Sequence, residues 1–496
     1  MLFNSYSFVF LFFPLCILGF YICRKIGEKT GKDWLPKAFL LLFSLWFYGF
    51  SGPENLPVIL LSMAVNYGLS FWMEKADRKK PLLVAGLILN VGALLCFKYT
   101  GASYVPLAIS FFTFSQIAFL MECYRGTLGK VSALDYSVYV TFFPKLMEGP
   151  IALPDEMLSR IRTIMDRKYD WERMFRGFSL FTLGLAKKVL IADTLGKAAD
   201  YGYTNLASLN SGDALIVMLS YTLQLYFDFS GYCDMAMGAA GCLGFELPLN
   251  FDSPYKAGNI IEFWKGWHIT LTRFFTRYLY IPLGGNRKGK ARMYLNTLLV
   301  FLISGIWHGK GLTFIIWGMM HGVLYVVTRW YQEKKKNKGE DVAIEPFADR
   351  GVDSGTDRSE GKKVKRVLSV FATFLYVNVA WVFFRAPDLK EALALLKTII
   401  SCNFARINRN LAGCFNLDEF WYVIKVLHLD SWQYAHYILM VLMLLFALIL
   451  VFFAKTAVTV SGKIKPTVVN TLLLAALFVW CVVTFSEVST FLYFNF

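Results

Sequence analysis

Charged residues are scarce in this chain of 496 residues, where Asp, Glu, Lys and Arg together make up only 17%. A soluble globular domain averages roughly 25%. Apolar residues make up 56%, the mean hydropathy is +0.48, and apolar stretches long enough to cross a bilayer recur from the first residues to the last. So little charge argues against a large water-soluble surface. It predicts an all-α, polytopic integral protein of the cell membrane.

Acidic residues are the scarcer charged class, with 35 Asp and Glu against 51 Lys and Arg, for a net charge of +16. In a membrane protein such an excess sits in cytoplasmic loops and orients the helices, so we expect lipids and no nucleic acid as partners. Basic residues crowd the connections 24–37 and 74–80, whereas the connection 51–56 has none. This alternation predicts an extracytoplasmic N-terminus.

Cysteine motifs are absent, because the nine cysteines show neither a CxxC pair nor a metal-finger spacing. Most of them lie in apolar runs, where a thiol behaves as a small hydrophobic group. We therefore expect neither a disulfide framework nor a cysteine metal site. The opening segment also lacks a basic n-region and an A-x-A cleavage site, so we expect it to be a retained first helix.

Apolar segments predict ten to thirteen membrane helices in a single domain. The segments lie at 6–23, 37–51, 56–73, 81–97, 105–121, 174–195, 213–230, 367–385, 435–454 and 468–494. We expect a helical core over 1–330, a charged and flexible cytoplasmic loop over 331–366, and C-terminal membrane helices over 367–496.

The middle of the chain is less regular. Residues 153–188 mix arginines and lysines with apolar residues, as amphipathic helices at a membrane surface do. The stretch 231–310 is apolar, yet Gly, Pro and charged residues interrupt it every few positions. Such backbone is tolerated at membrane depth only where protein or a water-filled cavity covers it, so we expect short, tilted or re-entrant helices around a cavity.

Histidine is rare as well, and three of the five histidines, His268, His308 and His321, fall within 54 residues. Imidazole gains and loses a proton near neutral pH, which suits a general base, although a histidine can also be a hydrogen-bonded core residue. His308 lies in the apolar, glycine-flanked run SGIWHGKGLTFIIWGMMHG and is the strongest catalytic candidate. The spacings between the three match no standard metal motif, so we expect no metal.

Acidic groups at membrane depth give a second signal. Asp228 and Asp234 are six residues apart, a spacing that does not place both carboxylates on one face of a helix. We therefore expect them to cap broken helices or to pair with the arginines downstream, in a supporting role.

A basic run follows at Arg287, Lys288, Lys290 and Arg292. The overlapping segment 284–291, GGNRKGKA, imitates a phosphate loop but lacks the Ser or Thr that holds magnesium. The run can serve as a membrane-edge anchor, or Arg287 and Lys288 can attract an anionic nucleotide such as a coenzyme. Both readings stay open.

The runs NFDSPYKAGNIIEFWKGWHITLTRFFTRYLYIPLGGNRKG and SGIWHGKGLTFIIWGMMHG resemble the membrane-bound O-acyltransferase family, in the branch of the alginate O-acetyltransferase membrane subunit. Together they form a signature block over 250–322. Supporting matches are TFFPKLMEGPI, LYFDFSGYCDMAMG and VAWVFFRAPDL. The resemblance implies a ring of helices around a central funnel or tunnel.

The resemblance also implies the chemistry. His308 of the WHG motif matches the family's catalytic histidine, His268 of FWKGWH matches its partner, and His321 matches a further histidine. The adjacent Trp307 and Trp267 would support them. No bound cofactor is implied; acetyl-CoA would be the acyl donor, a separate extracytoplasmic esterase-like acetyltransferase the partner, and a cell-surface polysaccharide the acceptor.

Departures and alternatives remain. Thr276 and Arg277 stand where the branch commonly has an Arg-Asp pair, and Lys145 and Glu148 stand where His and a small apolar residue are common. The rival within the enzyme class is a D-alanyl transferase for teichoic acids, which shares the FW-x-x-WH and WHG motifs. A transporter or flippase would also have broken helices and buried charges.

Overall fold

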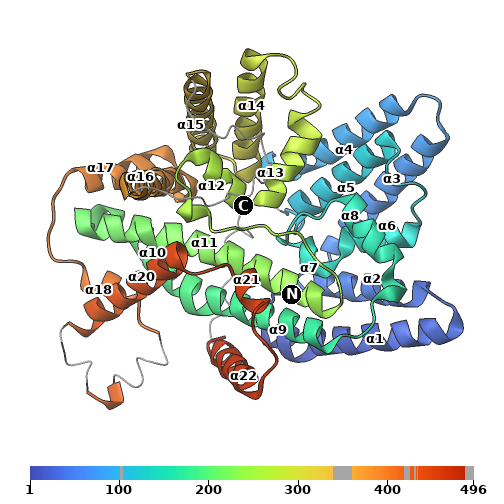
Figure 1. The fold of residues 1–496 in the computed structure, drawn as a ribbon, viewed down its shortest axis with the longest axis horizontal. Coiled ribbons are helices and arrows are strands. Elements are labelled where there is room, and N and C mark those ends of the chain that lie inside the picture. Colours follow the sequence, from blue (N-terminus) through green and yellow to red (C-terminus); the bar gives the residue numbers. More distant parts are fainter. Residues whose placement is uncertain (101–103, 339–359, 418–424, 429–431, 433, 486–496) are drawn as a thin grey trace. The chain divides into compact units, whose positions relative to one another are not determined.

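The structure is a computed structural model, and it describes residues 1–100, 104–338, 360–417, 425–428, 432 and 434–485. Over these residues every regular element is a helix and none is a strand (Figure 1). The prediction of an all-α protein is therefore confirmed.

The chain folds into two compact units. The first consists of Met1–Ala186, Gly231–Leu249 and the C-terminal stretch from Ala457, and the second of Lys187–Ser230 and Asn250–Thr456. The long helix α11 (Ser211–Cys242) gives its first part to the second unit and its last part to the first. The signature block 250–322 lies wholly in the second unit.

The first unit contains the apolar segments expected near the N-terminus, and each of them is a helix. The first extends to Thr30, beyond the expected end near residue 23. In chain order the helices of this unit are η1 (Ser7–Phe12), α1 (Phe13–Thr30), α2 (Trp34–Gly49), α3 (Asn55–Lys75), α4 (Lys79–Tyr99), α5 (Ile109–Arg125), α6 (Ala133–Thr141), α7 (Phe143–Leu146), α8 (Pro154–Arg162), η2 (Ile164–Asp166), α9 (Trp171–Ala186), α21 (Ala457–Ser461) and α22 (Val468–Val483).

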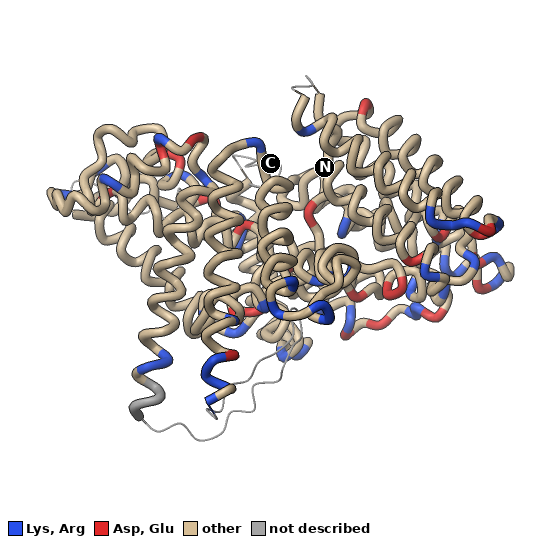
Figure 2. Tube along the Cα trace, turned by 90° about the horizontal axis from the view of Figure 1, so that it is seen from above, with Lys and Arg blue, Asp and Glu red and all other residues tan. Residues whose placement is uncertain are grey.

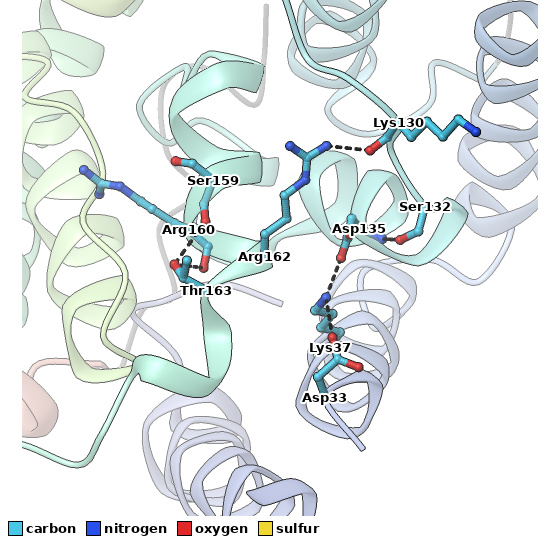
Figure 3. Close-up of polar contacts among 9 residues, drawn as sticks. All are labelled: Asp33, Lys37, Lys130, Ser132, Asp135, Ser159, Arg160, Arg162 and Thr163. Atoms are coloured by element: carbon cyan, nitrogen blue, oxygen red, sulfur yellow. Dashed lines mark hydrogen bonds and ion pairs between the residues drawn. The ribbon is translucent and has the colours of Figure 1, made fainter. Parts of the chain in front are cut away.

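Polar contacts fix the ends of α2, α6 and α8 within this unit (Figure 3). The ammonium group of Lys37 lies 3.3 Å from a carboxylate oxygen of Asp33 and 2.9 Å from one of Asp135. The guanidinium of Arg162 donates hydrogen bonds to two backbone carbonyl groups of the segment 128–130. These contacts tie together connections whose charge predicts the cytoplasmic side.

The second unit contains the rest of the described helices. They are η3 (Lys187–Ala192), α10 (Asp193–Thr204), η4 (Leu206–Ser208), η5 (Pro254–Lys256), α12 (Ile260–Gly266), α13 (Ile269–Phe275), η6 (Thr276–Tyr280), α14 (Lys290–His308), α15 (Leu312–Asn337), α16 (Glu360–Arg385), α17 (Leu389–Ile400), α18 (Arg409–Gly413) and α20 (Ala435–Phe453).

The irregular stretch is shorter than expected. The expectation of broken helices over the whole of 231–310 is wrong, because α11 runs on to Cys242 and α14 is regular from Lys290 to His308. Glycines here allow close packing without breaking the helix: a Cβ added to Gly238 would lie 2.6 Å from the carbonyl oxygen of Gly177. Short helices joined by irregular backbone occupy 243–289 only.

The expected charged loop is also shorter than predicted. Helix α15 continues to Asn337 and α16 begins at Glu360, so both ends of the segment 331–366 are helical. Residues 339–359, where a flexible loop was expected, lie outside the described residues. So do residues 486–494 of the last expected helix.

Six of the described helices are long and apolar enough to cross a membrane. They are Ser7–Thr30, Asn55–Lys75, Lys79–Tyr99, Leu312–Asn337, Val364–Arg385 and Ala435–Phe453. Lys and Arg residues gather toward helix ends and connections, while the long helices are uncharged along most of their length (Figure 2). The protein is therefore a multi-pass membrane protein, as predicted.

Candidate active site

The three clustered histidines lie on different elements of the second unit. His268 immediately precedes α13, His308 is the last residue of α14, and His321 lies in the interior of α15. All three are buried, with 1%, 4% and 0% of their surface exposed. Such burial is costly for an ionisable side chain and is typical of functional groups in membrane proteins.

Helix α14 packs closely against α15 (Figure 1), and both His308 and His321 contact Trp317 of α15. A Cβ added to Gly305 would lie 2.5 Å from the carbonyl oxygen of Phe314, and one added to Gly318 would lie 2.5 Å from that of Phe301. Real Cβ atoms do not approach a carbonyl so closely. The two glycines therefore set the separation of the helices that carry these histidines.

Aromatic rings surround His308. The centroid of its imidazole lies 4.6 Å from that of Trp307, 5.0 Å from that of Trp317 and 5.1 Å from that of Phe384. Trp307 and Trp317 come from the same hairpin, whereas Phe384 comes from α16. Three helices thus enclose the candidate base in a low-dielectric environment, where a charge that develops on a reacting group interacts strongly with its neighbours.

His321 occupies an aromatic box. Its ring centroid lies 5.1 Å from those of Trp264 and Trp317, and 6.0 Å from that of Phe263, whose ring stacks on it. Within the described part of the chain, neither ring nitrogen of His321 has a hydrogen-bond partner. A buried polar group without a partner costs about 1–3 kcal/mol, which favours a role in binding over a purely structural one.

His268 is held by a side-chain network and by strained backbone. Its Nδ1 atom lies 3.1 Å from Oδ1 of Asn250, and that oxygen also accepts hydrogen bonds from the backbone N–H and the hydroxyl of Thr270. The φ angle of His268 is +45°, in the left-handed region that non-glycine residues rarely adopt. Phe229 packs edge-on against the ring at 4.8 Å.

Tryptophans connect the surroundings of the three histidines. The ring of Trp267, next to His268, lies 4.9 Å from that of Trp381, which in turn lies 5.7 Å from that of Trp317. The structure therefore places all three sequence-predicted histidines along one aromatic cluster. It also places the expected supporting residues Trp267 and Trp307 in direct contact with that cluster.

Asp228 has a different role from the one expected. The expectation that it caps a broken helix is wrong, because α11 continues through this position. Asp228 lies inside α11, and its carboxylate is 2.7 Å from the ammonium group of Lys188, which also lies 2.8 Å from Asp193. Lys188 comes earlier in the chain, and only the fold shows that it neutralises this buried acid.

Asp234 belongs to the other unit. It is buried in the interior of α11, where Gly184 of α9 packs so closely that an added Cβ would lie 2.9 Å from the Cβ of Asp234. Asp234 therefore lies within this helix and not at one of its ends.

The basic run lines a cavity of about 440 Å³ at the N-terminal end of α14. Arg287 and Lys288 contribute cationic side chains to its wall, together with Arg329 of α15, and neither Arg287 nor Lys288 has an ion-pair partner among the described residues. Lys290 instead pairs with Glu333 at 3.2 Å, and Arg292 does not line the cavity. Two residues of the run therefore face a cavity, as an anion-binding role requires.

Over the described residues, no group of three His, Cys, Asp or Glu side chains is placed to hold a metal ion. Ring contacts through Trp267, Trp381 and Trp317 connect the surroundings of His268, His308 and His321.

Three contributors were missed by the sequence-based prediction. Asn250 is an ordinary polar residue at the start of the signature run, Trp381 belongs to an apolar segment, and Arg329 lies far along the chain from Arg287. The only available signal was a buried polar type, asparagine, beside the irregular segment. Their roles depend on contacts between elements that no sequence pattern specifies.

Comparisons with known proteins give the family context. The profile of MBOAT, the membrane-bound O-acyltransferase family, matches residues 97–333. A peptidoglycan O-acetyltransferase of Helicobacter pylori is 38% identical over 448 residues, covering 81% of this chain and 80% of that protein. A probable alginate O-acetylase of Pseudomonas aeruginosa is 33% identical over 443 residues, covering 83% and 78%.

A teichoic acid D-alanyltransferase of Bacillus subtilis is 27% identical over 241 residues, which cover 46% of this chain and 60% of that protein. The relatives named as O-acetyltransferases thus match far more of the chain. At more than 30% identity over about four-fifths of both lengths, they also confirm the predicted enzyme class, an O-acyltransferase. The chain belongs to the membrane-bound O-acyltransferase family.

Proposed function

We propose that this enzyme takes an acetyl group from cytoplasmic acetyl-CoA and passes it across the membrane for O-acetylation of an extracytoplasmic polysaccharide. The observation that carries the proposal is that one face of α14 extends from the basic cavity to the candidate base. This face lines the cavity at Thr297 and ends at the buried His308. A cation-lined cavity and a buried base on one helix suit a polyanionic thioester donor.

The donor path follows from helix geometry. Thr297, Val300, Ser304 and His308 recur at intervals of three or four residues and so share one face of α14. Val300 and Ser304 also line a small cavity of about 20 Å³ next to Trp264. At 1.5 Å per residue, Thr297 and His308 are about 16 Å apart along the axis, a span for the long arm of a coenzyme A thioester.

The nucleotide end of coenzyme A carries phosphate groups. Arg287 and Lys288 would bind them, because charge-assisted hydrogen bonds to phosphate are strong. The same end of the α14–α15 hairpin carries Lys334, Lys335 and Lys336. The positive-inside rule assigns this end to the cytoplasm, the compartment that supplies acetyl-CoA, and by the same rule the N-terminus is extracytoplasmic.

His308 would act as the general base. The acceptor hydroxyl oxygen attacks the thioester carbonyl carbon and a C–O bond forms, while His308 takes the hydroxyl proton. The C–S bond then breaks, the imidazolium returns the proton to the leaving thiolate, and the products are an acetyl ester and free coenzyme A. A thioester is an activated acyl donor, so positioning and one base suffice.

Acceptor and partner follow from the relatives' names and the motif resemblance. The relatives in this family are named for O-acetylation of peptidoglycan and alginate, both of them cell-surface polysaccharides. A separate extracytoplasmic acetyltransferase would place the acetyl group on the polymer. The transporter alternative is set aside, because the chain belongs to an acyltransferase family.

Replacement of His308 by Ala tests the proposal in cells. The measurement is ester-linked acetate on the cell-surface polymer, at matched membrane abundance of the variant. The control is His436→Ala, which removes a histidine that interacts with Asn416 outside the aromatic cluster. We expect acetate to fall to background in His308→Ala only; undiminished acetate would refute the catalytic role.

D-alanyl transfer to teichoic acid is the second candidate, favoured by the partial match to the Bacillus subtilis protein. The same experiment separates the two, since D-alanine esters can be assayed on the same polymer. Loss of D-alanine with unchanged acetate would support this alternative. Binding of coenzyme A to the purified protein would oppose it, because the rival reaction draws its acyl group from a carrier protein.

A further inference from the structure

The backbone of Asn250 is hydrogen-bonded to the turn that carries His268. Asn250 is fully buried, and its backbone carbonyl accepts a hydrogen bond of 3.0 Å from the N–H of Ile269. Nearby, the N–H of Asp252 donates to the carbonyl of Gly266 at 2.9 Å. A Cβ at Gly266 would lie 2.7 Å from the Asp252 carbonyl oxygen, so glycine permits this close pairing.

The contacts of Asn250 determine which end of its amide faces His268. The Oδ1 atom lies 3.1 Å from the backbone nitrogen of Thr270, 2.8 Å from the hydroxyl of Thr270 and 3.1 Å from Nδ1 of His268. A backbone N–H can only donate, so the atom that faces it must be the amide oxygen. An amide oxygen carries no hydrogen, and Nδ1 of His268 must therefore bring the proton to their contact.

The other ring nitrogen of His268 is then an acceptor. Burial lowers the pKa of His268 to about 3, so the ring is neutral at physiological pH and carries a single proton. With that proton on Nδ1, the Nε2 atom presents a lone pair. Nε2 is buried and has no hydrogen-bond partner among the described residues.

We propose that Asn250 is a positioning residue that holds His268 as the Nδ1–H tautomer, so that Nε2 accepts a hydrogen bond from a hydroxyl group of the acyl acceptor. This inference rests on the proposed function. His268 could either bind the acceptor or donate a hydrogen bond to the thioester carbonyl, and the tautomer distinguishes these two roles. The carbonyl needs a hydrogen-bond donor, which a neutral Nε2 without hydrogen cannot be. His268 therefore binds the acceptor and does not polarise the donor.

The inference also constrains the acceptor. The reacting hydroxyl gives its only proton to His308, so the hydroxyl bound at Nε2 of His268 is a neighbouring one. The acceptor at this site must therefore carry a second hydroxyl group beside the reacting one, whether it is a sugar or a group on the extracytoplasmic partner. A site built to bind a substrate hydroxyl strongly rejects an analogue that lacks it, because its buried polar atom is then left unpaired.

Nuclear magnetic resonance tests the tautomer without any substrate. The full-length protein is labelled with nitrogen-15 histidine in lipid, and the His268 signals are assigned by their loss in His268→Gln. We expect a protonated Nδ1 and an unprotonated Nε2 in the natural protein and in Asn250→Asp, which keeps an acceptor oxygen. A protonated Nε2 in the natural protein would overturn the inference.

Kinetics with purified protein test the functional part. Asn250→Leu removes the acceptor oxygen at similar volume and should lower kcat/KM for the acceptor at least about tenfold, or about 1.4 kcal/mol, with unchanged affinity for coenzyme A. Asn250→Asp should restore most of this activity. The matched control is Asn378→Leu, since Asn378 is also buried, and its one side-chain hydrogen bond among the described residues goes to Phe374 of its own helix.

Two outcomes would contradict the positioning role. One is that Asn250→Leu weakens coenzyme A binding as much as acceptor use, and the other is that a folded Asn250→Asp is as inactive as Asn250→Leu. Failure of the proposed function would give a different result, because His308→Ala would then still transfer acetyl groups. The tautomer of His268 would still be determined independently from its nuclear magnetic resonance signals.

Discussion

The indole ring of Trp317 lies between the imidazole rings of His308 and His321, with its centroid 5.0 Å from the first and 5.1 Å from the second. Both contacts are edge-to-face, at interplanar angles of 86° and 69°. Trp317 is 1% exposed and also stacks on Trp381 of α16. One side chain therefore sets the positions of two candidate site histidines from two helices.

Removal of this ring should disturb both histidines. Truncation of a buried tryptophan to Ala costs about 3–5 kcal/mol, so Trp317→Ala should lower the thermal unfolding temperature and abolish acetyl transfer, whereas Trp317→Phe should keep part of both. Trp72→Ala is the control, since that side chain is 60% exposed on α3. Equal losses in the two alanine variants would show that the position of Trp317 is not special.

Replacement of His321 by Phe separates binding from packing. Neither imidazole nitrogen has a partner in the described structure, so an apolar ring of similar shape should change the free energy of unfolding by less than about 1 kcal/mol. We nevertheless expect acetyl transfer to fall at least about tenfold, because a buried imidazole beside the donor path would hydrogen-bond to substrate. Full activity in His321→Phe would assign the residue to packing alone.

The cavity assignment is tested by charge removal within one basic run. The double substitution Arg287→Gln and Lys288→Gln should weaken binding of coenzyme A at least about tenfold, and more at low salt, since exposed charges interact over about 10 Å at 0.1 M ionic strength. Arg292→Gln removes a charge next to the cavity but not from its wall and should bind normally. Equal weakening by both would favour a membrane-edge anchor.

The buried ion pair of Lys188 and Asp228 should stabilise the second unit only as a complete set. Asp228→Leu takes away the nearer carboxylate from Lys188, whose side chain is 2% exposed, and breaking a buried pair costs about 3–5 kcal/mol. Lys188→Met combined with Asp228→Leu should recover most of that loss. Glu172→Gln, which breaks an exposed pair with Arg176, should change unfolding by less than about 1 kcal/mol.

The sequence carried enough information for the architecture. Long apolar stretches have few structural solutions in lipid, so the helices 55–75, 79–99 and 435–453 followed from hydropathy alone. The three histidines stood out for a related reason, because an ionisable residue in an apolar run needs an explanation. These predictions depended on local composition.

Interactions between helices that are distant in the chain could not be predicted from the sequence. Glycine and aspartate suggested a break in α11, but the fold neutralises Asp228 with a lysine 40 residues earlier and uses glycines such as Gly238 for close helix packing. The same limit hid Asn250, whose importance lies in a single oxygen shared with Thr270 and His268. Composition indicates that a group is buried, but only the fold shows what neutralises or orients it.

The close approach of α14 and α15 gives the last prediction. Gly305→Ala and Gly318→Ala each place a Cβ 2.5 Å from a backbone carbonyl oxygen of the facing helix, so the helices must separate, at a cost of about 1–3 kcal/mol. Because His308 ends α14 three residues after Gly305, the loss of acetyl transfer should be larger than the loss of stability alone explains.

Gly68→Ala in α3 is the matched control, since no atom lies within 4 Å of its added Cβ, and alanine there should stabilise the helix by about 0.5–1 kcal/mol. Thermal unfolding and acetate release from acetyl-CoA measure the two effects; normal activity in both hairpin variants would show that the separation of α14 and α15 does not position His308.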